Sequence, residues 1–169
     1  MRLPTRYTIL LASVLVVGWA SARGAVAVKE GDVAPQFSVT TDQGRHLTST
    51  EYGARMLVLN FWHTSCVPCV KELPSLSDFA RVFRSEGVTV LAVSGDEDDG
   101  KYRRFLHDHR VLLQTYRDPS LRISRSFGTF MFPETYIIQR GRIVRKVIGG
   151  IDWTSDDMRS FIRSRLDQR

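Results

Sequence analysis

The apolar residues of the chain form two continuous runs with a helical pattern between them. Residues 56–62 and 88–94 are apolar at most positions, which is typical of strands buried on both faces of a sheet. Across 73–83, apolar residues recur every three or four positions and predict a helix that begins near Val67 and ends at Gly87. A strand, a helix and a second strand in this order predict a parallel β-α-β unit.

Shorter apolar segments around turn residues predict two β-hairpins. Their strands and turns are 33–39 and 45–47 around the turn 41–44, and 135–138 and 143–147 around the turn 139–142. In the first turn, Gly44 takes the position that needs a positive φ. The remaining predicted elements are a helix at 101–109, a short strand at 112–116, a helix at 120–127 and a C-terminal helix at 154–166. Together they predict the α/β class, with a central mixed sheet covered on both faces.

Residues 1–27 are expected to form a targeting segment, because Arg2 and Arg6 precede an uncharged, mostly apolar run at 7–22. Two small-residue sequences resemble signal-peptide cleavage sites: Ala20-Ser21-Ala22 and Ala25-Val26-Ala27. The apolar core is shorter than the roughly 20 residues of a membrane span, which favours cleavage. An uncleaved N-terminal membrane anchor stays open as the alternative. With either outcome, we expect the domain to face an oxidising compartment outside the cytoplasm.

The composition is that of one globular domain, which we place at 29–169. Of the 169 residues, 43% are hydrophobic and 25% are charged, which is enough for a buried core. The 24 lysines and arginines exceed the 18 acidic residues, but they are spread along the chain without a dense basic run. This distribution argues against a nucleic-acid-binding protein.

Cys66 and Cys69 are the only two cysteines, and they lie where the strand 56–62 meets the predicted helix. The unpaired N–H groups and the dipole at a helix start favour a thiolate on Cys66. In an oxidising compartment the pair could form a structural disulfide, but a bridge that closes so short a loop constrains the unfolded chain little. Thiol–disulfide exchange is the better interpretation, with Cys66 as nucleophile and Cys69 resolving the mixed disulfide.

Several segments resemble the TlpA/ResA-like thioredoxin family of extracytoplasmic thiol–disulfide oxidoreductases. The resemblance spans about 30–165 and rests on four segments in the family's order: 34–37 (APQF), 60–74 (NFWHTSCVPCVKELP), 132–138 (FPETYII) and 141–143 (GRI). It implies a thioredoxin-like fold with an N-terminal β-hairpin extension and no cofactor beyond the Cys66–Cys69 disulfide. It also implies protein disulfides as substrates, a membrane thiol–disulfide transporter as electron donor, and in some members a role in cytochrome c maturation.

The resemblance also assigns roles to residues around the cysteines. It implies that Pro133 is cis and lies against the cysteine pair, where it shapes a substrate groove. Asn60 occupies the place of a buried aspartate in ordinary thioredoxins, and the resemblance gives the proton-accepting task to Glu72 instead. A solvated helix glutamate is the alternative for Glu72. The further candidates for substrate binding or for tuning the cysteines are Trp62, His63, Val67, Pro68, Phe132 and Glu134, the last with a surface strand glutamate as its alternative.

The chain departs from the family pattern at three places. Ser65 replaces the usual tryptophan before the nucleophile, which reduces the apolar rim. His63 is bulkier than the usual alanine or glycine; when charged it would lower the pKa of the Cys66 thiol, and the alternative is a loop histidine without effect on catalysis. The apolar segment 130–132 precedes Pro133, and we expect it to contribute both to a docking surface and to the core.

Three other interpretations stay open. His107 and His109 could complete a zinc site with the cysteines, but residues two apart on a helix point to different faces, so we expect no metal site. A thiol peroxidase is an alternative enzyme class, because segments like 34–37 also occur in peroxiredoxins. The third alternative is a copper-binding or partner-binding module in which Cys66 and Cys69 hold a soft metal.

Overall fold

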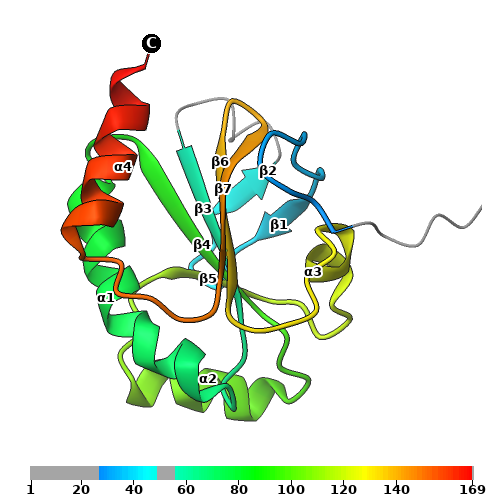
Figure 1. The fold of residues 1–169 in the computed structure, drawn as a ribbon. Helices are drawn as coiled ribbons and strands as arrows, with labels where there is room; N and C mark the ends of the chain where they lie inside the picture. Colours follow the sequence, from blue (N-terminus) through cyan, green and yellow to red (C-terminus); the bar gives the residue numbers. More distant parts are fainter. Residues whose placement is uncertain (1–26, 49–55, 169) are drawn as a thin grey trace, which may run out of the picture.

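A five-stranded mixed sheet organises the computed structural model, which describes residues 27–48 and 56–168 (Figure 1). The strand order is β5-β4-β3-β6-β7, with β3 in the centre. The strands are β3 (Met56–Trp62), β4 (Val88–Ser94), β5 (Gln114–Arg117), β6 (Glu134–Gln139) and β7 (Arg142–Ile148). Strands β3, β4 and β5 are parallel, whereas β6 runs antiparallel to β3 and β7 antiparallel to β6. The predicted β-α-β unit is therefore the core of the molecule.

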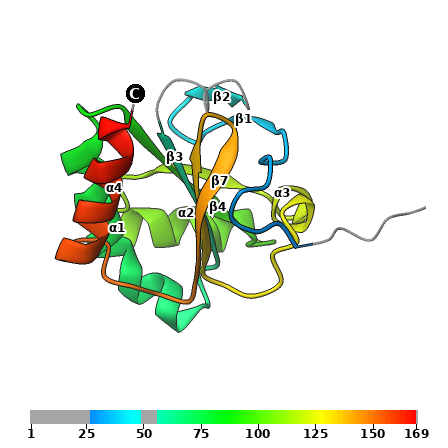
Figure 2. The same cartoon turned by 45° about the horizontal axis from the view of Figure 1, so that its top comes forward.

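The two faces of the sheet have different covers (Figures 1 and 2). One face packs against α1 (Val67–Phe83), α2 (Asp99–Asp108) and α4 (Asp156–Asp167); the other packs against α3 (Arg122–Ser126) and the hairpin of β1 (Ser38–Thr40) and β2 (His46–Thr48). Because successive side chains of a strand point to opposite faces, β3 supplies both cores. Met56, Val58 and Trp62 belong to the core under α1, and Leu57, Leu59 and Phe61 to the core under the hairpin.

Residues 27–48 also run along the two outer strands of the sheet. On β7, Gly31 N donates to the Ile143 carbonyl at 2.8 Å, and Ile143 N donates to the Asp32 carbonyl at 2.9 Å. On β5, Asp42 N donates to the Thr115 carbonyl at 2.8 Å. Residues 27–48 therefore cover the face of the sheet that carries α3 and also form hydrogen bonds to both edge strands.

The fold class predicted from the sequence is confirmed, including both hairpins and the positive φ of +76° at Gly44. Some predicted boundaries are wrong. The first strand of the N-terminal hairpin is Ser38–Thr40 and not 33–39, because Val33 makes only an isolated bridge, to Arg142. Helix α1 ends at Phe83, four residues before Gly87, and the short strand is shifted to Gln114–Arg117, because Leu112 is 87% exposed and lies outside the sheet. Helix α3 is shorter than predicted because Leu121, just before it, has a left-handed conformation with φ +55°.

The predicted targeting segment at 1–27 lies outside the described residues, apart from its last residue. Within 27–48 and 56–168, no helix is both long and apolar enough to cross a membrane.

Candidate active site

Cys66 and Cys69 form a disulfide at the N-terminus of α1, with their Cα atoms 5.2 Å apart. Cys66 is the N-cap residue, and its sulfur accepts a hydrogen bond from Cys69 N at 3.3 Å. Pro68 follows in the first turn of the helix, where its missing N–H is not needed. Cys69 is fully buried and Cys66 is partly exposed, so only the Cys66 sulfur is open to attack or to a partner.

Residues 129–133, which lead into β6 and which we call the proline loop, lie directly against the cysteine pair. The Phe132–Pro133 bond is cis, as the family resemblance implied, and Pro133 is buried. The Phe132 carbonyl oxygen lies 3.4 Å from Cys66 Sγ. The sulfur of a disulfide has no proton to donate, so this approach becomes a hydrogen bond only when Cys66 is reduced to a thiol.

Glu72 lies beneath the cysteines and is 3% exposed, so its interpretation as a solvated helix glutamate is wrong. Its Oε1 accepts from Asn60 Nδ2 at 2.9 Å, and its Oε2 accepts from Ile151 N at 3.3 Å and from Trp153 Nε1 at 3.2 Å. Burial raises the pKa of Glu72 above its usual value of 4.5, and the bonds from Trp153, Asn60 and Ile151 lower it by less. Glu72 is therefore a buried carboxyl group with a raised pKa, one helical turn after Cys69.

A cleft of about 500 Å³ reaches Glu72 from the surface. It lies between the first turns of α1 and the loop before α4, and its lining consists of Pro68, Lys71, Glu72, Pro74, Ser75, Gly150, Ile151 and Asp152. The loop packs tightly on α1, because a Cβ on Gly150 would lie 2.8 Å from the Pro68 carbonyl oxygen. The cleft therefore connects the buried carboxyl group of Glu72 with the surface.

Glu134 follows Pro133 and is 1% exposed, so its interpretation as a surface strand glutamate is also wrong. Lys146 Nζ lies 2.6 Å from Glu134 Oε1, and the Tyr136 hydroxyl donates to the same oxygen. Tyr136 belongs to the core under the hairpin, whereas Glu72 approaches the sheet from α1 on the other face. The structure therefore places Glu134 in a buried ion pair behind the proline loop, and the sequence offered no indication of Lys146 as its partner.

His63 contacts a carboxylate that the sequence reasoning missed. His63 Nδ1 lies 3.1 Å from Asp96 Oδ1, and the side chain of Asp96 is only 3% exposed. Asp96 follows β4, and His63 follows β3, its parallel neighbour. Because the carboxyl ends of parallel strands meet at one edge of the sheet, the order of the strands could have revealed this pair.

Exposed apolar side chains occur in the two segments that meet at Cys66, the start of α1 and the residues before Pro133. Val67 is 64% exposed, Phe130 76% and Met131 49%, whereas Phe132 is partly buried and packs against both cores. The segment 130–132 therefore contributes to both the surface and the core, as expected. Trp62 is fully buried and packs against Tyr102 and Phe105 of α2, with ring centroids 6.2 and 5.5 Å apart.

The two histidines of the zinc alternative have other neighbours. The side chain of His107 is 89% exposed and pairs with adjacent Asp108, and the ring of His109 stacks on Phe105 at 3.9 Å. Within the part of the chain that the structure describes, no group of three or more histidine, cysteine, aspartate or glutamate residues is arranged to hold a metal ion.

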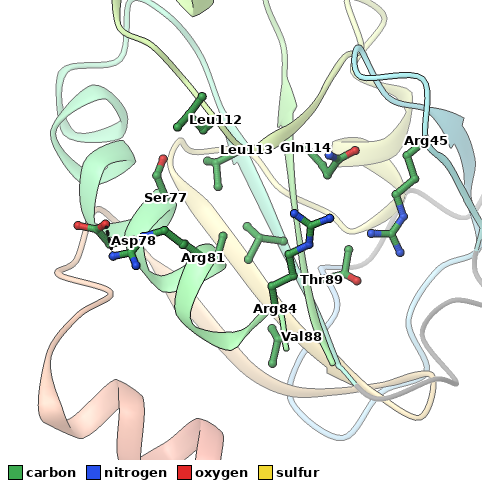
Figure 3. A pocket seen from close by; sticks show the side chains of 12 residues that line it. Arg45, Ser77, Asp78, Arg81, Arg84, Val88, Thr89, Leu112, Leu113 and Gln114 are labelled. Carbon is green, nitrogen blue, oxygen red and sulfur yellow. Dashed lines mark hydrogen bonds and ion pairs between the residues drawn. The ribbon is translucent and has the colours of Figure 1, made fainter. Parts of the chain in front are cut away.

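A second cavity, of about 360 Å³, lies at the other end of α1 (Figure 3). Its lining consists of Arg45, Ser77, Asp78, Ala80, Arg81, Arg84, Val88, Thr89, Val90, Leu112, Leu113 and Gln114. Arg81 is paired with Asp78 at 3.1 Å, and α1 separates this cavity from Cys66 by roughly 20 Å at 1.5 Å per residue. None of the candidate residues lines it, so the chemistry belongs to the cysteine loop and not to this cavity.

Comparisons with known proteins show the family and the fold of the chain. Residues 30–147 match the AhpC/TSA family. The thiol-disulfide oxidoreductase ResA of Bacillus thuringiensis is 28% identical over 167 residues, which cover 96% of this chain and 95% of that protein. ResA of Bacillus subtilis is 28% identical over 153 residues, 88% of this chain and 86% of that protein.

Comparison with solved structures shows which fold the chain has. A putative thiol:disulfide interchange protein DsbE from Chlorobium tepidum superposes with a TM-score of 0.75 at 23% identity, over 83% of this chain and 99% of that chain. This likeness shows the thioredoxin-like fold. The predicted resemblance and enzyme class, a thiol–disulfide oxidoreductase, are confirmed by the relatives, and the chain belongs to the AhpC/TSA family.

Proposed function

We propose that the protein is an extracytoplasmic enzyme that reduces protein disulfides through Cys66 and Cys69. One observation carries the proposal: the partly exposed Cys66 sulfur lies at the start of α1 beside the Phe132 carbonyl, while buried Cys69 lies one turn before the buried carboxyl group of Glu72. An exposed nucleophile, a shielded second thiol and a proton acceptor are the parts that dithiol–disulfide exchange needs.

In the first step, the Cys66 thiolate attacks one sulfur of the substrate disulfide. A new S–S bond forms, the substrate bond breaks, and the leaving sulfur takes the electron pair and then a proton from water. The Cys69 N–H that bonds Cys66 Sγ at 3.3 Å, together with the helix dipole, stabilises the thiolate before attack.

In the second step, the Cys69 thiol passes its proton to Glu72 and attacks Cys66 Sγ of the mixed disulfide. The second substrate thiolate leaves, the Cys66–Cys69 disulfide forms, and the substrate has gained two electrons. The proton then leaves Glu72 through the cleft beside Gly150. A dithiol of a membrane thiol–disulfide transporter returns two electrons to the disulfide and completes the cycle.

The apolar rim suggests what kind of substrate segment approaches. Val67 next to Cys66, and Phe130 and Met131 in the segment before Pro133, are exposed, which suits an extended substrate segment with apolar residues beside its disulfide. The Phe132 backbone, 3.4 Å from Cys66 Sγ, would line the place where this segment binds. Cytochrome c maturation, periplasmic location and membrane anchoring through 1–27 belong to the proposal on the strength of the family resemblance.

Trapping with Cys69→Ser tests this proposal. Without the resolving thiol, the variant should accumulate mixed disulfides through Cys66 when it is incubated with an extract of extracytoplasmic proteins, and mass spectrometry identifies the partners. The matched control, Cys66→Ser, keeps one buried thiol and should trap nothing. A Cys69→Ser variant that traps no protein and whose Cys66 reacts slowly with iodoacetamide would contradict disulfide exchange.

A thiol peroxidase is the second candidate, because the match to the AhpC/TSA family at 30–147 is consistent with it. Consumption of hydrogen peroxide by the reduced protein, at a rate well above its reduction of insulin disulfides, would favour this function. Copper retained by the reduced protein, without insulin reduction, would favour the metal-binding alternative.

A further inference from the structure

One ring nitrogen of His63 faces a hydrogen-bond acceptor and a donor at the same time. Nδ1 lies 3.1 Å from Asp96 Oδ1, 3.2 Å from Ser65 N and 2.8 Å from Ser65 Oγ. With a proton, Nδ1 donates to the carboxylate; without one, it accepts from the Ser65 N–H. It cannot do both, so a proton on Nδ1 decides which of the two contacts is a hydrogen bond, and a charged ring always carries that proton.

Asp96 provides a buried charge that favours the protonated ring. Its carboxylate accepts from Thr64 N at 2.9 Å, from Thr64 Oγ1 at 2.6 Å and from Ser94 Oγ at 2.6 Å. These donors are all neutral, and the ring of His63 is the group within ion-pair distance of this carboxylate. A buried carboxylate without a positive partner is costly, so a charged imidazole at this position would compensate Asp96.

The backbone connects His63 to the nucleophile. Cys66 N donates to the His63 carbonyl oxygen at 3.0 Å, and Ser65 lies between the two residues. A change of partner at Nδ1 therefore acts on the residue just before Cys66. A positive charge at this place also stabilises the Cys66 thiolate.

The other charged and titratable groups near Asp96 do not change their protonation state around neutral pH. Arg117 donates to the Asp96 and Glu97 carbonyl oxygens at 3.3 and 3.0 Å and pairs with Asp99 at 3.1 Å. The hydrogen bond from Arg103 lowers the pKa of Asp99 most, which keeps this carboxyl ionised. Burial raises the pKa of Tyr102, which keeps its phenol neutral. His63 is thus the imidazole of this set, and its Nδ1 lies directly against Asp96.

We propose that His63, held by Asp96, is a positioning residue for Cys66 and that its protonation increases the thiolate fraction of Cys66. The inference rests on the proposed function, because the thiolate fraction matters if Cys66 is the attacking sulfur. The enzyme would then keep a reactive Cys66 at mildly acidic pH, where a thiol without such a neighbour is mostly protonated.

The alkylation rate of Cys66 by iodoacetamide between pH 5 and pH 9 tests this inference, measured in the Cys69→Ser protein so that one thiol reacts. His63→Gln should react about 3- to 10-fold more slowly at pH 6, since one unit of thiol pKa changes the thiolate fraction tenfold. The two rates should converge at pH 9. His63→Arg, which keeps a charge at every pH used, should restore the rate at pH 6.

The matched control is His107→Gln, which removes an exposed histidine that also lies beside an aspartate. It should leave the alkylation profile unchanged. Superimposable profiles for His63→Gln and the parent would overturn the inference. So would a His63→Arg variant as slow as His63→Gln, because the effect of His63 would then be one of shape and not of charge.

A second measurement needs no substitution and so does not depend on how a variant folds. Because coupling is reciprocal, the imidazole of His63 should titrate at a higher pH in the reduced protein than in the disulfide form, as followed by NMR. Equal midpoints would overturn the inference. Insulin reduction by the unsubstituted protein separates the two proposals: its absence contradicts the proposed function even where His63 changes the reactivity of Cys66.

Discussion

Two buried glutamates lie near the cysteines, and their partners differ. Glu134 has a cation, Lys146 Nζ, at 2.6 Å, so its charge is compensated. Glu72 has three neutral donors, from Asn60, Trp153 and Ile151, and burial raises its pKa. A carboxyl group that binds a proton more readily than usual is suited to exchange one with a thiol. This difference supports the proposal that Glu72 is the proton acceptor, whereas Glu134 belongs to a buried ion pair behind the proline loop.

Glu72→Gln should slow disulfide exchange at neutral pH by about 100-fold, the usual scale of a lost general base. Glutamine has the same shape, and its amide group can donate to Asn60 Oδ1 once the Asn60 amide turns over, because that oxygen is buried and has no partner within the described residues. The rate of insulin reduction, measured with excess dithiothreitol, gives the size of the effect. The deficit should shrink above pH 9, where hydroxide ionises Cys69 directly. A variant as fast as the unsubstituted enzyme at pH 7 would exclude Glu72 as the acceptor.

The same substitution should change how stability depends on pH. The pKa of Glu72 is raised in the folded state, so the folded protein holds this proton more tightly than the unfolded chain does. Its contribution to the free energy of unfolding is complete below pH 4.5 and is lost as pH rises through the folded-state pKa. Urea unfolding from pH 4 to pH 8 should show this loss in the unsubstituted protein and not in Glu72→Gln.

At the scale of elements, the sequence predicted the strands and helices that have regular apolar patterns. The continuous apolar run at 56–62 predicted β3 correctly, because all of its positions are buried and a buried strand is mostly apolar. The wrong boundaries are those where a single residue ends an element. Leu112 is apolar but exposed, and Leu121 takes a left-handed conformation that periodicity does not reveal.

For the site, the sequence predicted residues that belong to one element but not the contacts between elements. Spacing alone placed Cys66 at the start of a helix, with Cys69 and Glu72 on that helix. The contacts of Glu72 with Trp153 and of Glu134 with Lys146 join residues far apart in sequence, or on strands whose register is fixed only by folding. Such partners require the tertiary structure.

Helix α2 offers a test of an element by itself. Asp98 is its N-cap, and Asp98 Oδ1 accepts from Lys101 N at 2.9 Å. Asp98→Ala should lower the free energy of unfolding by about 1 kcal/mol, because the N–H at the start of the helix loses its acceptor. Urea unfolding measures the change. Glu97→Ala, next to it and exposed, is the control, and an equal effect of both substitutions would contradict the capping role.

At the scale of the whole molecule, Lys146 joins the proline loop to the N-terminal segment. Besides its ion pair with Glu134, its Nζ lies 3.4 Å from the Val28 carbonyl oxygen, and its backbone N donates to Glu30 Oε1 at 3.0 Å. The ammonium group also lies 5.2 Å from the ring centroid of Tyr136. One side chain of β7 thus contacts parts of the chain that are more than 100 residues apart.

Lys146→Met should lower the free energy of unfolding by about 3 kcal/mol, because it leaves the carboxylate of Glu134 buried without its cation. The double variant Glu134→Gln/Lys146→Met should recover most of this loss, since no charge then stays buried. Thermal and urea unfolding measure both effects. Lys101→Met, at an exposed position of α2, serves as the control. A double variant less stable than Lys146→Met alone would show that the pair does not account for the loss.

The hydrogen bonds from 27–48 to the outer strands affect how this protein can interact with unfolded chains. An enzyme that reduces disulfides meets chains that have not finished folding, and such chains aggregate by adding strands to open sheet edges. Here the outward backbone groups of Ile143 on β7 and of Thr115 on β5 already have partners. At these positions the edge strands are therefore protected against the addition of a strand from an unfolded chain.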